Sequence, residues 1–199
     1  MFSRKLSRII FIILLIVFVS NYISAQHNKL QINEWITNWY LFGPIELEED
    51  QSEVDHLGGF ENDYLSVYGG ETDPRIEIGR VETIGNLAAS WIEYTSLDSI
   101  INLDEAISKK SYIAAYAYKE IYAEEEGTYI FALGTNDGGR LWINGVEVWD
   151  YPGARGIALD NDLIPVLLKK GKNKILLKIE ERGNYWGFCA RILPFNIDT

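Results

Sequence analysis

The chain has 199 residues and a formal net charge of −11 at neutral pH. This excess of acidic residues disfavours binding to nucleic acid or to an anionic membrane surface, because phosphate groups would be repelled. The one cysteine, Cys189, excludes an internal disulfide, and the two histidines, His27 and His56, disfavour a histidine triad or a histidine-rich zinc site.

Residues 1–25 have the order of an export signal. A basic start precedes an apolar run, Ile9 to Val19, and small residues follow it. We expect cleavage after Ala25, so that 26–199 forms a single domain of a secreted or periplasmic protein. The apolar run is shorter than the roughly 18 residues of a spanning helix, so no membrane span is expected after cleavage.

The first half of the remaining chain has few regular patterns. The segment WYLFGPI, 39–45, predicts a strand that ends at a Gly-Pro pair. The polar stretch from Glu46 to Asp73 predicts an irregular surface loop. A further strand is expected at 89–97, and 103–110 predicts one helical turn.

The second half predicts strands in quick succession, because runs rich in β-branched and aromatic residues are separated by Gly, Asn and Asp. Several runs alternate with a period of two, which is typical of a strand with one buried face. The pattern predicts an all-β fold, an antiparallel β-sandwich of jelly-roll type. The expected strands are 112–122, 128–134, 139–143, 146–151, 163–168, 174–181 and 186–193.

Two tight turns follow from local residue types. Asn144-Gly145 joins two short strands and is the strongest short signal for a hairpin, since both central residues need a positive φ. The stretch TNDGG, 135–139, predicts a tight connection, in which Asp137 is expected as a turn former.

Four segments in chain order carry a family resemblance: WYLFGPI, FENDYL, 114–150 and 167–193. They resemble the galactose-binding-like jelly-roll modules attached to many secreted bacterial glycoside hydrolases and esterases. The resemblance implies the fold and an exported bacterial protein. It leaves the ligand open, since fold and function separate easily.

The central stretch also resembles the protective-antigen-type lectin module, in which an Asp-Asp pair in this turn binds calcium and the sugar. Here the pair is Asn136-Asp137, so one carboxylate is missing. Because calcium takes six to eight oxygen ligands, we expect no cofactor and only a small effect of calcium. A calcium-dependent lectin stays open as an alternative.

The sequence contains no pattern typical of a catalytic site. The carboxylate runs 124–126 and 180–181 do not have the spacing of a catalytic pair, and no G-x-S-x-G motif occurs. We therefore expect a protein that is not an enzyme.

Aromatic residues are the better indication of function, because flat rings bind the C–H faces of sugars. Two loop-edge segments, 149–156 and 182–187, combine aromatic residues with arginine and glycine, and they predict a binding rim for carbohydrate or a cell-surface glycan. If the rim does not bind, the loop 46–73 is the next candidate; a structural module that docks onto an exported partner protein is the other class of function. The candidate ligand-binding residues are Trp149, Tyr151, Arg155, Arg182, Tyr185 and Trp186, although Trp186 could instead plug one end of the sandwich.

Overall fold

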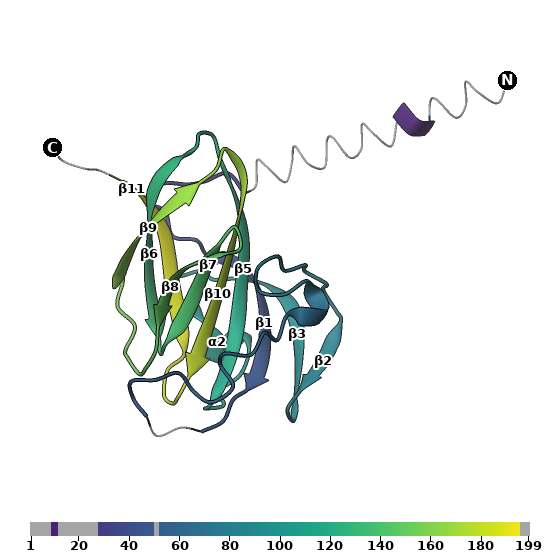
Figure 1. The fold of residues 1–199 in the computed structure, drawn as a ribbon, viewed down its shortest axis with the longest axis vertical. Coiled ribbons are helices and arrows are strands. Elements are labelled where there is room, and N and C mark those ends of the chain that lie inside the picture. The colour runs from purple at the N-terminus through teal and green to yellow at the C-terminus, as the bar shows by residue number, and fades with distance from the viewer. Residues whose placement is uncertain (1–8, 12–27, 50–51, 196–199) are drawn as a thin grey trace.

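The computed structural model describes residues 9–11, 28–49 and 52–195 (Figure 1). The expected export signal, 1–25, lies outside the described residues except for 9–11. Among the described residues, no helix is long and apolar enough to cross a bilayer.

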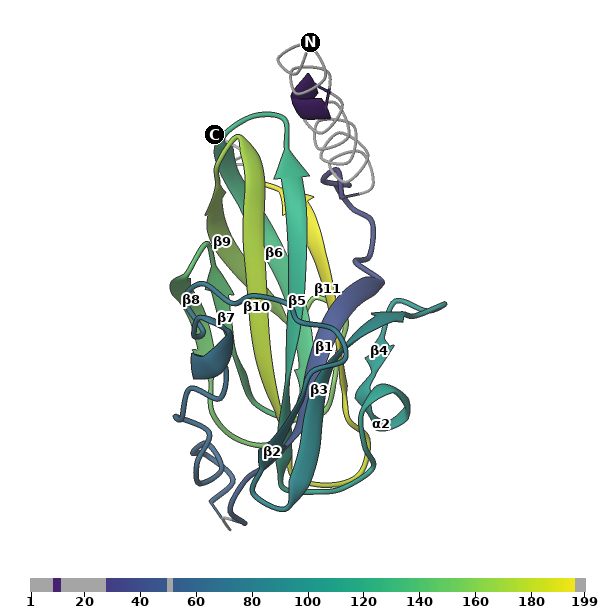
Figure 2. The same cartoon turned by 90° about the vertical axis from the view of Figure 1, so that its right-hand side faces the viewer.

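Two antiparallel sheets form the fold, and they pack face to face (Figures 1 and 2). The larger sheet has the strand order β2-β3-β1-β5-β10-β7-β8, and the smaller sheet has the order β4-β11-β6-β9. The strands are β1 (Asn38–Glu46), β2 (Val81–Ile84), β3 (Leu87–Thr95), β4 (Ile101–Asn102), β5 (Ile113–Ala123), β6 (Gly127–Asn136), β7 (Gly139–Ile143), β8 (Val146–Tyr151), β9 (Asp162–Leu168), β10 (Gly171–Glu181) and β11 (Gly187–Pro194).

The predicted all-β, antiparallel sandwich of jelly-roll type is confirmed. Each of the nine segments predicted as strands overlaps a strand of the structure. The predicted helical turn, 103–110, contains the short helix α2 (Leu103–Ala106). The sequence did not predict β2 or β4, which are short and carry no period-two run of apolar residues.

The inner core lies between the two sheets. Phe131 and Leu133 of β6 face Ile175, Leu177 and Ile179 of β10, and all five side chains are buried in one cluster. Within each strand these residues alternate with a period of two, the pattern expected of a strand with one buried face. Period two therefore located this core correctly.

A second apolar core lies on the other face of the larger sheet. The segment from residue 52 to residue 80, here called the cover segment, packs onto that face and contains the short 3-10 helix η1 (Ser66–Tyr68). Figure 2 shows it in blue, crossing in front of β10, β5 and β1. Leu57, Phe60, Leu65 and Tyr68 are buried there against sheet residues such as Phe42 and Trp91, so the prediction of a surface loop is wrong for these residues.

The two predicted turns differ in what they connect. Asn144 and Gly145 have φ values of 53° and 79° and join β7 to β8, so the predicted hairpin is confirmed. The stretch 135–139 is tight, but it links β6 of the smaller sheet to β7 of the larger sheet. Its Asn136-Asp137 peptide bond is cis. Asp137 therefore lies where the chain passes from one sheet to the other.

Candidate functional site

The two segments of the predicted rim meet at the carboxylate of Asp137. Its Oδ1 accepts a hydrogen bond from the backbone N–H of Arg155 at 3.1 Å, and its Oδ2 accepts one from the backbone N–H of Arg182 at 2.9 Å. Asp137 is buried, and burial raises the pKa of its carboxyl group although the two backbone hydrogen bonds oppose that shift. The carboxylate thus ties both loops to the turn between the sheets.

Three of the candidate ligand-binding side chains form one stack at the edge of the sandwich. The rings of Trp149 and Tyr151 are 6.4 Å apart and nearly parallel, and the Arg155 guanidinium lies 4.1 Å from the centre of the Tyr151 ring. Arg155 also pairs with Asp162 on β9 at 2.6 Å and donates to the hydroxyl of Thr135. The Arg155 side chain is 9% exposed: its polar contacts are to β6 and β9 of the smaller sheet, and its ring contacts are to β8 of the larger sheet.

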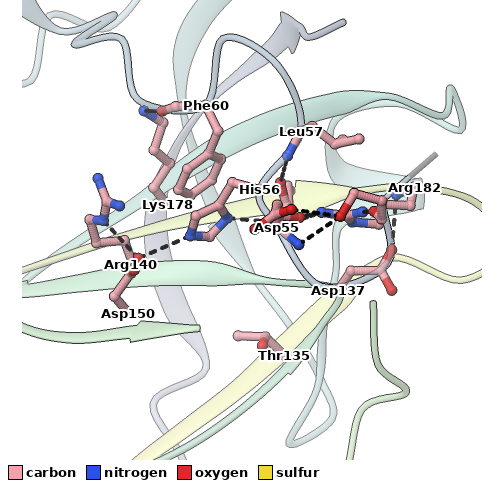
Figure 3. A network of polar contacts seen from close by, with 12 residues as sticks. Asp55, His56, Leu57, Phe60, Thr135, Asp137, Arg140, Asp150, Lys178 and Arg182 are labelled. Carbon is pink, nitrogen blue, oxygen red and sulfur yellow. Dashed lines mark hydrogen bonds and ion pairs between the residues drawn. The ribbon is translucent and has the colours of Figure 1, made fainter. Parts of the chain in front are cut away.

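Arg182 holds the start of the cover segment. Its guanidinium donates to the backbone carbonyls of Ser52 and Asp55, and it pairs with Glu180 at 2.9 Å (Figure 3). The side chain is 10% exposed. Both terminal nitrogens of the guanidinium therefore already bind groups of the protein itself.

Tyr185 and Trp186 lie apart from this stack. Tyr185 is 37% exposed, and burial together with the charges of Asp104 and Asp98 raises its pKa, which places it beside α2. Trp186 is fully buried in the inner core, where the alternative interpretation placed it, and its backbone N–H donates to Asp104. Tyr185 is thus the one of these two residues that a ligand could contact in this structure.

A polar network that the sequence did not predict lies beside the rim. His56 contacts Asp150 through Nε2 at 3.0 Å and Glu180 through Nδ1 at 3.3 Å, and its ring stacks on Phe60 (Figure 3). Burial disfavours the charged imidazole, but the hydrogen bonds and charges of Glu180 and Asp150 outweigh burial and raise the pKa of His56. His56 therefore links β8 and β10 to the cover segment.

Lys178 fastens the middle of the cover segment. Its ammonium group donates to the carbonyl oxygens of Phe60 and Asn62 and to Glu71, the last at 3.0 Å, and it lies over the rings of Phe60, Tyr64 and Tyr116. Burial lowers the pKa of Lys178, and Glu71 offsets only part of that shift. The sequence signal that could have revealed this network is KILLKIEE, in which Lys178 and Glu180 share one face of a largely apolar strand.

Metal ligation has little basis near Asp137. Among the described residues, no three His, Cys, Asp or Glu side chains are placed to hold a metal ion together. Both carboxylate oxygens of Asp137 accept backbone hydrogen bonds. The donor set therefore does not fit a calcium ion, which needs many free oxygens.

A hollow of about 590 Å³ lies on the outer side of the larger sheet, away from the rim. Here called the outer hollow, it lies between the sheet and residues 74–78 of the cover segment. On the sheet, Tyr40 is paired in register with Glu93 on β3 and with Tyr118 on β5, so these three residues form one cross-strand row. The Tyr118 hydroxyl donates to Glu120, which also pairs with Lys172 at 3.1 Å. The volume lies within the usual range of small-molecule sites.

Lys119 lies at a gap in the sheet at the edge of the outer hollow. On the edge of β5 that faces β1, the ladder ends at the pair Tyr40 and Tyr118. Backbone hydrogen bonding on this edge resumes only at Tyr122, which bonds to Asn28. Within this gap, the ammonium group of Lys119 donates to the side-chain oxygens of Asn28 at 3.0 Å and Asn38 at 2.7 Å. Lys119 is 7% exposed, and burial lowers its pKa to about 8.

Comparisons with known proteins leave the family open. No protein-family model and no curated protein matches the chain. Among solved structures, it is similar to a β-glucosidase from Kluyveromyces marxianus (20% identity, 54% of this chain and 14% of that chain, TM-score 0.42). It is also similar to the PA14 domain of the MpAFP antifreeze protein (19% identity, 43% of this chain and 46% of that chain, TM-score 0.35). The chain thus spans less than half the length of either structure, and likenesses this weak assign neither a family nor a ligand.

Proposed function

We propose that this chain is an exported, non-catalytic carbohydrate-binding domain and that the sugar binds in the outer hollow. The observation that carries the proposal is the outer hollow itself, in which a row of tyrosine and carboxylate groups faces residues 74–78. The rim predicted from the sequence is the weaker site, because Arg155 and Arg182 are engaged in contacts with the protein.

The lining of the outer hollow matches the surface of a sugar. Tyr40 and Ile78, a residue that is 60% exposed, supply apolar area for the C–H faces of a ring. Glu93 and Asn38 supply oxygens that accept hydrogen bonds from hydroxyl groups, and Lys119 supplies N–H donors. A polyol both donates and accepts, so it needs this mixture.

The contacts of the two carboxylates that line the outer hollow, Glu93 and Glu120, support binding without catalysis. Hydrolysis of a glycosidic bond by the common mechanism needs two carboxyl groups that act as acid and as base or nucleophile. In the outer hollow, Glu120 is occupied by the Tyr118 hydroxyl and by Lys172. Glu93 alone cannot perform both roles.

The proposal is tested by titrating the purified protein with a panel of soluble polysaccharides. We expect a dissociation constant between micromolar and millimolar, about −8 to −4 kcal/mol. Tyr40→Ala should weaken binding about ten-fold, since it removes the ring from the floor of the outer hollow. Ile78→Ala, at an exposed position, should weaken it less and leave the melting temperature unchanged.

Two rim variants serve as matched controls. Trp149→Ala and Tyr185→Ala should leave the affinity unchanged if the sugar binds in the outer hollow. If these variants abolish binding while Tyr40→Ala does not, the site is the rim predicted from the sequence. If no glycan binds at all, the proposed function is wrong.

A second candidate function, docking onto an exported partner protein, is favoured by a different surface. On the outer side of the smaller sheet, Leu193, Ile130 and Pro165 are aligned in register across β11, β6 and β9. Leu163 and Leu167 beside them are 59% and 60% exposed. A contiguous exposed apolar patch is typical of an interaction surface.

Cross-linking inside the producing cell tests this second candidate. A photoreactive amino acid at position 163 should give one discrete cross-linked product, which Leu167→Lys should abolish. The same amino acid at the exposed position 147, on β8, should give none. Equal products from both positions would argue against docking at this sheet.

A further inference from the structure

The ammonium group of Lys119 is a buried charge with neutral partners. Its two hydrogen-bond acceptors are the amide oxygens of Asn28 and Asn38. In the described part of the chain, neither Lys119 nor Arg75, which also lines the outer hollow, forms an ion pair within 4 Å. A buried ammonium group without an anionic partner is costly, and an anion that binds beside it recovers that cost.

Other charged groups around Lys119 define the environment that a ligand would meet. The charge of Glu93 on β3 opposes the lowering of the Lys119 pKa by burial, so this carboxylate is near but not in contact. Glu120 is neutralised by Lys172, and Lys174 pairs with Asp73. A smaller hollow, lined by residues 28–31 and 34–38, shares Lys119 with the outer hollow. The remaining titratable or charged groups that line the two hollows are Tyr40, Tyr118, Lys29 and Glu34.

From this arrangement we infer that the outer hollow takes an acidic sugar, a uronic acid residue of a polysaccharide, with its carboxylate against Lys119 and Arg75 and its hydroxyl groups against Glu93 and Tyr40. The inference rests on the proposed function and names the class of sugar. A neutral sugar can accept a hydrogen bond from Lys119 but cannot compensate its charge. A uronate does both, which is why the buried lysine favours it.

Net charge and the local site have opposite effects on such a ligand. The chain is acidic overall, so an acidic polysaccharide is repelled at long range. Long-range repulsion between exposed charges is screened at physiological salt, whereas a contact with a buried ammonium group is screened much less. Binding of an acidic oligosaccharide should therefore improve with moderate salt.

The test compares two probes that differ in one charge per residue. Tri-galacturonate and its fully methyl-esterified form are titrated into the purified protein at pH 6.5. We expect the acid to bind about ten-fold more tightly than the ester, because the ester lacks the carboxylate charge. Lys119→Met should reduce affinity for the acid about ten-fold and leave affinity for the ester within a factor of about two.

Two further variants make the test independent of how well Lys119→Met folds. Arg75→Gln changes an exposed residue of the outer hollow and should weaken binding of the acid several-fold, with an unchanged melting temperature. Lys170→Met, at an exposed position that does not line the outer hollow, is the matched control and should change nothing.

The pH dependence provides a second readout. Lys119 loses its charge near pH 8, so the preference of the wild-type protein for the acid over the ester should shrink between pH 6.5 and pH 9.5. In Lys119→Met the ratio should not change over this range.

The outcomes distinguish failure of the inference alone from failure of the proposed function. If acid and ester bind equally, or if Lys119→Met weakens both equally, the uronate inference is overturned while carbohydrate binding stands. If neutral glycans bind and both probes fail, the same conclusion holds. If neither these probes nor any neutral glycan binds, both proposals fail.

Discussion

The two faces of the larger sheet are covered in different ways. The inner face packs on the regular strands of the smaller sheet, and the middle of that core is apolar; on β10, buried polar side chains of the inner face lie only towards the strand ends, at Asn173 and Glu181. The outer face packs on the irregular cover segment, and buried charges lie among its apolar residues, chiefly Lys178 and Glu180.

Backbone hydrogen bonding explains the difference. A strand satisfies its N–H and C=O groups in the ladder, so a strand-covered core needs only apolar side chains. An irregular segment that is pressed against a sheet has backbone groups with no ladder partner, and leaving them unpaired would be costly. The sheet supplies the partners: Lys178 bonds to the carbonyls of Phe60 and Asn62, Arg182 to those of Ser52 and Asp55, and Glu180 to the N–H of Leu57.

The largest expected effect is a cavity in the inner core. Phe131→Ala should destabilise the protein by about 3–5 kcal/mol, because the ring is fully buried between the sheets. Equilibrium unfolding in urea measures this. The control Leu163→Ala, on the exposed face of the same sheet, should change stability by no more than about 0.5 kcal/mol. Similar costs for both variants would contradict the position of the inner core.

Removing Lys178 should break the outer cover while leaving the sandwich folded. Lys178→Met should cost about 3 kcal/mol, because Glu71 loses its ion pair and the carbonyls of Phe60 and Asn62 lose a hydrogen-bond donor. Hydrogen exchange should rise in residues 57–73 more than in β6 and β11. The double variant with Glu71→Gln should recover part of the loss; if it is additive, Lys178 and Glu71 are not coupled.

Alanine substitutions at two glycines distinguish two causes of destabilisation. One cause is backbone strain at a positive φ, and the other is a clash between the β7–β8 hairpin and the cover segment. Gly145 and Gly171 both have positive φ, 79° and 92°, but a Cβ at Gly145 would lie 2.4 Å from the carbonyl oxygen of Thr72, whereas a Cβ at Gly171 meets nothing within 4 Å. Gly171→Ala should cost about 1 kcal/mol, and Gly145→Ala about 2–3 kcal/mol. Thermal unfolding measures both, and equal costs would show that the cover segment moves aside freely.

A smaller effect is the pH dependence of the outer cover through His56. The folded state raises the pKa of His56 above its ordinary value of 6.5, so the stabilisation from the charged imidazole is fully present below that value and is lost as pH rises through the folded pKa. His56→Gln should therefore cost about 1 kcal/mol at pH 5.5 and less at pH 8.5. A cost that grows with pH would mean that the neutral ring is the stabilising form.

The smallest expected effect is that of calcium. Asp137 uses both carboxylate oxygens for backbone hydrogen bonds from the two rim loops, which leaves a poor set of calcium ligands. Millimolar calcium should shift the melting temperature by less than about 1 °C. A rise of many degrees that a chelator reverses would restore the calcium-dependent lectin as the better interpretation.

The sequence by itself determined nine of the strands, the Asn144-Gly145 hairpin and the apolar faces of β6 and β10. Each of these depends on near neighbours: period-two alternation places Ile175, Leu177 and Ile179 on one face, and a two-residue turn needs only local φ values. Trp39, Trp91 and Trp142 lie within three of the predicted strands and are buried.

Only the tertiary structure decided how the outer face is covered and where a ligand could bind. Lys178 meets the carbonyl of Phe60 across 118 positions of the chain, and Glu180 meets the N–H of Leu57 across 123. An irregular segment has no periodicity that indicates which strand it will contact. The sequence therefore could not predict which residues of 52–80 are buried, the gap at Lys119, or the contacts of Arg155 and Arg182 within the protein. The physical reason is that these features depend on partners for isolated polar groups, and only the folded chain brings such partners together.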